Sequence, residues 1–244
     1  LELDFKNNAK NACPKISFLK IEISNQNIKP YKGKLKSYFD DLDCKKNNFF
    51  TDISNYLSYE MGQPTHCYDA TKIKEKITLD YVDGNNIFET LLNSKINLVD
   101  RNLVFLNDNE IINLAGVIGG KNSSCSVNTT SALIECAYFE PEEIIGKSVI
   151  YDVHSDAAHK FERIVDSECH EEVLRRFVQI VSEYVEIKNV EIFSKVYNEH
   201  QTTKFHLDVN KINKIIGINL NQDECIKYLE KLNFKIDQVS IQIP

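Results

Sequence analysis

The sequence predicts an α+β fold, with a large mixed α/β unit at residues 1–198 followed by a small unit at residues 199–244. Apolar residues recur at alternate positions in some segments and at spacings of three and four in others, which are the periods of strands and helices. The composition changes at residues 198–204, "NEHQTTK". Apolar residues make up 42% and charged residues 27% of the 244 residues, values typical of a globular protein with a buried core.

The first third of the chain predicts one strand and two helices. Residues 16–23, "ISFLKIEI", alternate as a strand does, and residues 32–42 predict a short helix. Residues 47–61, "NNFFTDISNYLSYEM", repeat apolar side chains at spacings of three and four and predict an amphipathic helix. Gly62 supplies its C-terminal stop, and Pro64 prevents the helix from resuming.

The middle third predicts strands. Residues 76–82, "KITLDYV", alternate, and residues 103–120 carry apolar runs on both sides of a polar turn, the pattern of a hairpin. We expect the second strand of that hairpin to end at the glycine pair 119–120. Residues 131–141, "SALIECAYFEP", predict a short and mostly apolar strand with one carboxylate, Glu135, in its middle.

Helices follow, and a strand closes the large unit. Residues 141–149 predict a helix that opens with a proline, at a position where its missing N–H costs nothing. Ser155 is placed to cap a helix beginning at Asp156. Residues 168–185 predict a longer helix, and residues 189–197, "NVEIFSKVY", predict a further strand.

The small unit predicts a strand, two helices and a strand, at residues 205–209, 210–217, 221–234 and 235–243. Asn221 and Glu224 make a capping pair for the second helix. About 40 residues are too few for a comfortable independent core. We therefore expect this unit to be truncated at Pro244 or docked on the large unit.

Charge and cysteine usage narrow the class of protein. The net charge is −7, with 36 acidic and 29 basic residues, so any nucleic-acid contact must be local or shared with a partner.

Seven widely spaced cysteines include no CxxC pair and no compact Cys/His cluster, which favours reduced thiols in a cytosolic protein and predicts no metal site. No apolar run approaches the roughly 18 residues of a membrane span. The start, "LELDFKNNAK", lacks a signal-peptide pattern and a methionine, and we expect an excised piece.

Polar groups gather in apolar surroundings at Ser54–Asn55 with His66, at Glu135, and at residues 154–163. By spacing alone, His66 is either a satisfied core histidine or a functional one. Burying a carboxylate is costly unless it is paired, so Glu135 implies either a cavity or a salt bridge with a partner such as Arg163.

Covalent hydrolysis has little support in the sequence. There is no GxSxG elbow and no cysteine in a known catalytic setting beside a histidine. Cys67 follows His66, but neighbouring strand residues point to opposite faces. A triad of Ser155, His66 and Asp156 can be drawn, yet no local pattern supports it.

Five blocks follow one another along the chain: "CP" at 13–14, "DISNYLSYEMGQPTHCYD" at 52–69, "LAGVIGG" at 114–120, "LIECAYFEP" at 133–141 and "SDAAHKFERIVD" at 155–166. In this order and spacing they resemble the β subunit of bacterial-type phenylalanine–tRNA ligase. The family pattern reads D-x-T-N-Y-V with G-x-P-x-H-x-F-D, then L-A-G-I-M-G-G, L-E-x-A-x-F-x-P and T-D-A-S-x-R-F-E-R-G-V-D. The resemblance implies a central editing domain at residues 1–198 and the truncated start of a small winged-helix-like domain at residues 199–244.

The resemblance implies hydrolytic editing of misacylated Tyr-tRNA(Phe), in support of ATP-dependent aminoacylation by the whole enzyme. It implies tRNA(Phe) and an α subunit as partners in a heterotetramer, with the aminoacylation centre in the α subunit. ATP and Mg²⁺ are then cofactors of the whole enzyme and not of this chain, and the enzyme is cytoplasmic. The alternatives are a non-catalytic module that binds RNA or an amino acid, and a purely structural region of the synthetase.

Matched to the family pattern, the candidate catalytic residues are His66 and Glu135. Glu135 corresponds to the carboxylate that accepts the hydroxyl of tyrosine, and His66 to a histidine lining the same pocket. Gly119 corresponds to a glycine whose missing side chain leaves room for the ligand. The candidate substrate-binding residues of the pocket are Ser54, Asn55, Pro64, Gly119, Ser155 and Ala157.

The chain departs from the family pattern at several positions. Ser155 stands for Thr, Ala158 for Ser and Ile164 for Gly, and Cys67–Tyr68 stand for Ala–Phe. The basic residues usual after the fourth block are thinned, which weakens contact with tRNA or neighbouring domains. We expect the editing activity to survive these changes.

Overall fold

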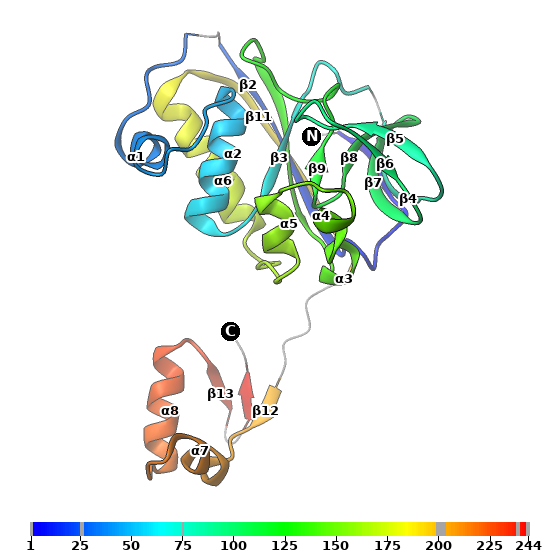
Figure 1. The fold of residues 1–244 in the computed structure, drawn as a ribbon. Helices are drawn as coiled ribbons and strands as arrows, with labels where there is room; N and C mark the ends of the chain where they lie inside the picture. The colour runs from blue at the N-terminus through cyan, green and yellow to red at the C-terminus, as the bar shows by residue number, and fades with distance from the viewer. Residues whose placement is uncertain (1, 25–26, 75, 199–203, 238–239, 243–244) are drawn as a thin grey trace. The chain divides into compact units, whose positions relative to one another are not determined.

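In a computed structural model, the chain forms two compact units, Leu1–Asn198 and Glu199–Pro244 (Figure 1). The structure describes residues 2–24, 27–74, 76–198, 204–237 and 240–242. Helices and strands are mixed along the chain, and the predicted α+β class is confirmed.

A four-stranded antiparallel sheet lies at the centre of the larger unit. Its order is β11 (Ile187–Val196), β2 (Lys15–Ile23), β10 (Ser131–Tyr138) and β3 (Thr65–Asp69). The strands predicted from residues 16–23, 131–141 and 189–197 are all present in this sheet. Because β10 lies between β2 and β3, the strand that carries Glu135 is central rather than at an edge.

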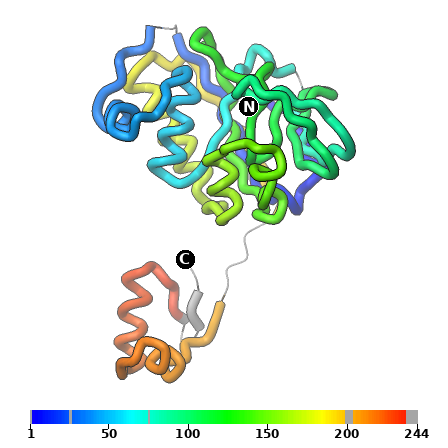
Figure 2. The backbone as a smooth tube through the Cα atoms, in the orientation of Figure 1, coloured from blue at the N-terminus to red at the C-terminus, as the bar shows by residue number. Residues whose placement is uncertain are grey.

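Helices cover one face of this sheet. Helices α2 (Phe49–Met61) and α6 (His170–Tyr184) lie side by side against it, with α1 (Gly33–Asp41) beside α2 (Figures 1 and 2). Alternate residues of the strands point toward these helices and share one apolar cluster with them, as Ile134 and Cys136 of β10 do. The period of two therefore turns the intervening residues, Glu135 among them, to the opposite face.

A five-stranded sheet packs against that opposite face. Its order is β1 (Asp4–Asn7), β4 (Lys76–Val82), β7 (Asn102–Asn107), β8 (Glu110–Leu114) and β9 (Ile118–Gly119). Leu133 and Ala137 of β10 share a second apolar cluster with residues of this sheet. A separate hairpin, β5 (Asn86–Glu89) with β6 (Lys95–Leu98), lies beside β9 through a bridge between Thr90 and Gly120. This hairpin was not predicted from the sequence.

Two predictions for the larger unit are wrong in detail. The second strand of the predicted hairpin ends at Leu114, since Gly116 takes a left-handed φ of 68° and the chain folds back as β9. The helix predicted for residues 141–149 is two short helices, α3 (Pro141–Ile144) and α4 (Lys147–Ile150), separated by Ile145 at ψ 126° and Gly146 at φ 80°. A left-handed residue cannot continue a right-handed helix.

The predicted helix ends that flank the site are confirmed. Gly62 ends α2 with φ 78°, and its N–H donates to the carbonyl of Ser58 at 3.1 Å. Ser155 caps α5 (Asp156–Phe161) because its hydroxyl accepts from the N–H of Ala158 at 3.1 Å. Both caps stand at the borders of segments that carry predicted site residues.

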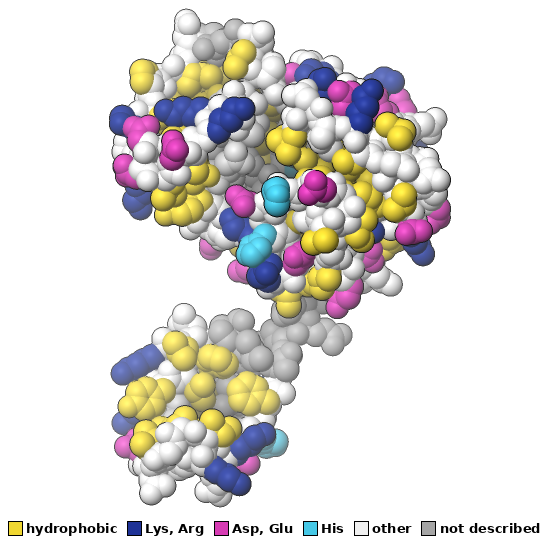
Figure 3. All heavy atoms as spheres, in the orientation of Figure 1, with side chains coloured by type: hydrophobic (Ala, Val, Ile, Leu, Met, Phe, Trp, Pro, Cys, Tyr) yellow, Lys and Arg dark blue, Asp and Glu magenta, His cyan; other side chains and the backbone are white. Residues whose placement is uncertain are grey.

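The smaller unit contains β12 (Lys204–His206), α7 (Val209–Ile216), α8 (Gln222–Lys231), β13 (Lys235–Asp237) and β14 (Ser240–Gln242). The predicted capping pair of Asn221 and Glu224 is confirmed as a full capping box. The single strand predicted for residues 235–243 is wrong, because β13 and β14 pair antiparallel. Apolar side chains are exposed on this unit (Figure 3), among them Ile215, Tyr228 and Leu232. Its winged-helix-like character stays a prediction.

All seven cysteines are free thiols. Within the described ranges, no helix has the length and apolar character needed to cross a membrane.

Candidate active site

A cavity of about 680 Å³ opens in the larger unit. In the space-filling view this face of the unit is hollowed between α1 and α2 on one side and the β5–β6 hairpin on the other (Figure 3). All eight residues that the sequence predicted for the site line this one cavity: Ser54, Asn55, Pro64, His66, Gly119, Glu135, Ser155 and Ala157. The structure brings these eight residues together, and their chemical roles stay predictions.

The turn after α2 and the pairing of β3 bring the two candidate catalytic residues together. Buried Gln63 donates from Nε2 to the carbonyl of Ala137 on β10 at 3.0 Å, which holds the turn against the sheet. β3 then pairs with β10 in the register that sets His66 opposite Glu135. Directly opposite residues of an antiparallel pair project to the same face. Both side chains therefore face the cavity.

Glu135 is buried, with 4% of its surface exposed, and its partners are neutral. Oε2 accepts from the hydroxyl of Tyr68 at 2.6 Å and from Nδ2 of Asn113 at 3.3 Å. Burial raises the pKa of Glu135 from its ordinary value to about 7, and the two hydrogen bonds oppose that rise. A buried carboxyl without a cation beside it is easier to protonate than one in water.

The salt bridge weighed as the alternative for Glu135 is wrong. Arg163 is exposed, and it donates to the carbonyl of His159 at 2.8 Å and lies 3.7 Å from Glu162. Tyr68 and Asn113 were not predicted from the sequence as partners of the carboxylate. A signal was available in Asn113, a polar residue within the apolar run "IINLA".

The imidazole of His66 packs directly over Gly119. A Cβ at position 119 would lie 2.0 Å from Cε1 and 2.6 Å from Nε2 of His66. The missing side chain thus makes room for the histidine itself, and room for a ligand remains a separate prediction. Burial lowers the pKa of His66 to about 4. Its Nε2 atom has no hydrogen-bond partner among the described residues.

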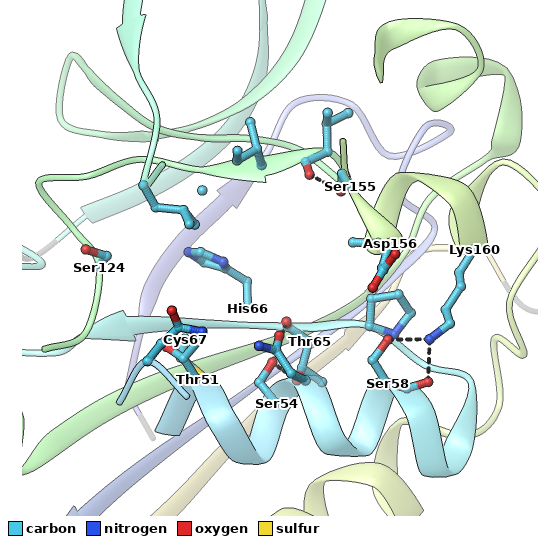
Figure 4. A pocket seen from close by; sticks show the side chains of 18 of the residues that line it. Thr51, Ser54, Ser58, Thr65, His66, Cys67, Ser124, Ser155, Asp156 and Lys160 are labelled. Carbon is cyan, nitrogen blue, oxygen red and sulfur yellow. Dashed lines mark hydrogen bonds between the residues drawn. The ribbon is translucent and has the colours of Figure 1, made fainter. Parts of the chain in front are cut away.

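One wall of the cavity belongs to α2. The hydroxyl of Ser54 bonds the carbonyl and the hydroxyl of Thr65 on β3, both at 2.7 Å, so it fixes the helix to the strand (Figure 4). Asn55 is exposed at the rim, whereas Pro64 is buried in the wall. The C-terminal half of α2 and the start of β3 therefore form one rigid side of the site.

The opposite wall belongs to α5 and the segment before it. The hydroxyl of Ser155 donates to the carbonyl of Val117 at 2.5 Å, and Ala157 lines the cavity on the first turn of the helix. Nζ of Lys160 donates to the carbonyl and hydroxyl of Ser58 at 2.6 and 2.7 Å, which joins α5 to α2 (Figure 4). Because the hydroxyl of Ser155 donates to Val117 and not to His66, the triad of Ser155, His66 and Asp156 drawn from the sequence is not formed.

Further lining residues were not anticipated from the sequence. Leu91 and Leu92, in the turn between β5 and β6, are exposed and line the cavity. Other unanticipated polar residues of the lining include Lys45, Asn47, Asn48, Thr51 and Ser124. His154 and Asp156, which also line the cavity, belong to the segment 154–163 that the sequence singled out. Among the residues that the structure describes, no three His, Cys, Asp or Glu side chains are grouped as a metal ion would require.

Comparison with known proteins identifies relatives of this chain. The family model described as B3/4 domain matches residues 12–186. The phenylalanine–tRNA ligase beta subunit of Fusobacterium nucleatum is 31% identical over 218 residues, which cover 88% of this chain and 27% of that protein. The beta subunit of the same name from Francisella tularensis is 29% identical over 191 residues, covering 78% and 24%. The chain spans about a quarter of the length of these curated relatives.

A solved structure was also similar. An N-terminal fragment of the phenylalanyl-tRNA synthetase beta subunit from Pyrococcus horikoshii aligns with 98% of this chain and 67% of its own, at 12% identity and a TM-score of 0.45.

Proposed function

The chain belongs to the B3/4 domain family, and from this membership we propose that it is the editing region of a phenylalanine–tRNA ligase β subunit. In this proposal the cavity binds the tyrosyl ester of misacylated tRNA(Phe), and water hydrolyses it. The names of the curated relatives support the enzyme class. The observation that carries the proposal is the buried carboxylate of Glu135 in the wall of a cavity.

A carboxylate at this place suits the discrimination that editing needs. Tyrosine differs from phenylalanine by one hydroxyl, which a pocket built for phenylalanine rejects only weakly by shape. A second site that bonds the hydroxyl favours the wrong amino acid instead, because phenylalanine leaves the buried acceptor unpaired. Oε1 of Glu135 accepts no hydrogen bond from the described residues and is the acceptor we assign to the tyrosyl hydroxyl.

The hydrolysis step is attack of water on the ester carbonyl, with the tRNA ribose oxygen as the leaving group. The groups at the site favour positioning over covalent catalysis. Burial raises the pKa of Cys67 and of Cys125, so both thiols are poor nucleophiles at neutral pH. A histidine with a pKa of about 4 is neutral at physiological pH and a weak base. We assign His66 the role of orienting the water or the ester through its unpartnered Nε2.

The remaining parts of the proposal concern the whole enzyme. We place the aminoacylation centre, with its ATP and Mg²⁺, in a partner α subunit, and we assign no residue of this chain to them. tRNA(Phe) and the α subunit are the proposed partners, in a cytoplasmic heterotetramer. The net charge of −7 requires the contact with tRNA to be local or shared with that partner.

Deacylation of Tyr-tRNA(Phe) by the parent enzyme tests the proposal. We expect Tyr-tRNA(Phe) to be hydrolysed faster than in buffer and faster than Phe-tRNA(Phe), and we expect His66→Ala to slow the reaction. Binding of Tyr-tRNA(Phe) without hydrolysis would replace editing with a binding module. If the enzyme neither binds nor hydrolyses Tyr-tRNA(Phe), the chain is a structural region of the synthetase.

A further inference from the structure

Tyr68 lies behind the cavity wall and contacts both candidate catalytic residues. It is fully buried, and it does not itself line the cavity. Its hydroxyl donates to Oε2 of Glu135 at 2.6 Å, and its ring stands edge-on to the imidazole of His66 with centroids 4.4 Å apart. His66 and Tyr68 are two residues apart on β3 and therefore share a face.

Asn113 completes the arrangement from the other sheet. Its Nδ2 donates to the hydroxyl of Tyr68 at 2.8 Å and approaches Oε2 of Glu135 at 3.3 Å. The phenol is thus a donor to the carboxylate and an acceptor from the amide, and both capacities are used. Asn113 belongs to β8 and Tyr68 to β3, so the bond network ties the two sheets together at the cavity.

A carboxylate has two oxygens, and this network occupies only one of them. Oε2 carries the phenol and the amide, whereas Oε1 receives no hydrogen bond within the described part of the chain. Since Glu135 lines the cavity, Oε1 is the atom left for a ligand. A ligand hydroxyl would be the second phenol on a carboxylate that already holds one.

We infer that Tyr68 is a positioning residue of this site, which holds Oε2 of Glu135 together with Asn113 so that Oε1 alone meets the hydroxyl of the acyl group. The inference rests on the proposed function. It makes the selectivity for a hydroxylated acyl group depend on a side chain that the ligand does not touch.

The ionisation of Glu135 depends on the same contacts. Burial raises its pKa, and the hydrogen bonds from Tyr68 and Asn113 lower it. The other titratable groups near the carboxyl are uncharged at neutral pH, because burial lowers the pKa of His66 and raises the pKa of the three neighbouring thiols, Cys13, Cys67 and Cys136. The hydroxyl of Tyr68 is itself neutral, since burial raises its pKa.

Tyr68→Phe tests the inference because it removes one oxygen and leaves the ring in place. We expect two changes: the pKa of Glu135 rises by about one pH unit, and the ratio of tyrosyl to phenylalanyl ester hydrolysis falls about tenfold, as the loss of a charge-assisted hydrogen bond implies. The pKa is measured by carbon NMR of carboxyl-labelled glutamate in the full chain, and the ratio with Tyr-tRNA(Phe) and Phe-tRNA(Phe) in the parent enzyme.

Tyr151→Phe is the matched control. Tyr151 is also a buried phenol with two hydrogen bonds, to the carbonyl of Val99 and to Asn102, but it lies outside the cavity lining. Tyr151→Phe should destabilise the fold to a similar degree and leave the pKa of Glu135 and the hydrolysis ratio unchanged. If Tyr68→Phe acted only through general packing, both variants would change these two readouts alike.

The possible results separate this inference from the proposed function. If the unmodified enzyme hydrolyses neither ester, the proposed function fails, and the pKa of Glu135 still decides whether Tyr68 acts on it. If the enzyme discriminates and Tyr68→Phe leaves the ratio unchanged, the inference is overturned. A ratio that rises in Tyr68→Phe also overturns it, because the phenol would then compete with the ligand for Glu135.

Discussion

Glu135→Gln should change how the stability of the protein depends on pH. The carboxyl has an ordinary pKa of 4.5 and a folded-state pKa of about 7, raised by burial. Because the folded state holds the proton more tightly, stability is lost as pH rises from 4.5 to 7 and stays lost above it. The difference between the two pKa values corresponds to about 3 kcal/mol. Glutamine keeps the shape without titrating and escapes that loss.

The assay is urea unfolding of both proteins from about pH 5 to about pH 8, followed by near-UV circular dichroism of the 11 tyrosines, since the chain has no tryptophan. The free energy of unfolding of Glu135→Gln, relative to that of the unmodified chain, should increase as pH rises to 7. Above pH 7 the difference between the two proteins should stay constant. Glu142→Gln, which removes a carboxylate at an exposed position, is the control. A difference for Glu135→Gln that does not vary with pH would refute the assignment of a buried, titrating carboxyl.

The same variant tests recognition. An ionised Glu135 accepts a phenolic hydroxyl through a charge-assisted hydrogen bond worth roughly 1.5–3 kcal/mol. Glu135→Gln should therefore lower the ratio of tyrosyl to phenylalanyl ester hydrolysis about tenfold or more at pH 8. An unchanged ratio would show that the hydroxyl is read elsewhere.

Two further predictions concern the backbone around the site. Ile164 takes φ 67° with 66% of its surface exposed; this left-handed conformation costs a non-glycine residue roughly 1–2 kcal/mol. Ile164→Gly should therefore raise the melting temperature by a few degrees, whereas Ile150→Gly, at a similarly exposed helical position, should lower it. A lower melting temperature in both variants would contradict the strain at Ile164. Gly119→Ala should cost about 1–3 kcal/mol by displacing His66 and should abolish most hydrolysis. In a His66→Ala background most of that stability cost should vanish. A double-mutant cycle of the two substitutions, measured by urea unfolding, tests this, and a coupling of zero would show that position 119 does not contact His66.

Local signals in the sequence predicted local structure well. The spacing of apolar residues and the cap at Gly62 predicted α2, and Ser155 and the Asn221–Glu224 pair predicted two helix starts. These features depend on residues within a few positions of each other, so the sequence carries them directly. Two of the errors came at interior glycines with a left-handed φ, Gly116 and Gly146, because a glycine permits a left-handed turn without requiring it. Residues 235–243 contain no glycine, so nothing in the sequence marked the break between β13 and β14.

For the site, the sequence by itself determined the residue types: a carboxylate in an apolar strand, a histidine after a helix stop, and motif resemblance that grouped them. Only the tertiary structure decided their partners. The register of β3 against β10 sets His66 opposite Glu135, and a shift of one residue would turn both side chains away from each other. Tyr68 meets Glu135 through the pairing of β3 with β10, whereas Asn113 and Gly119 meet Glu135 and His66 because the two sheets pack together. No pattern within a single segment specifies which distant atom fills the space beside it.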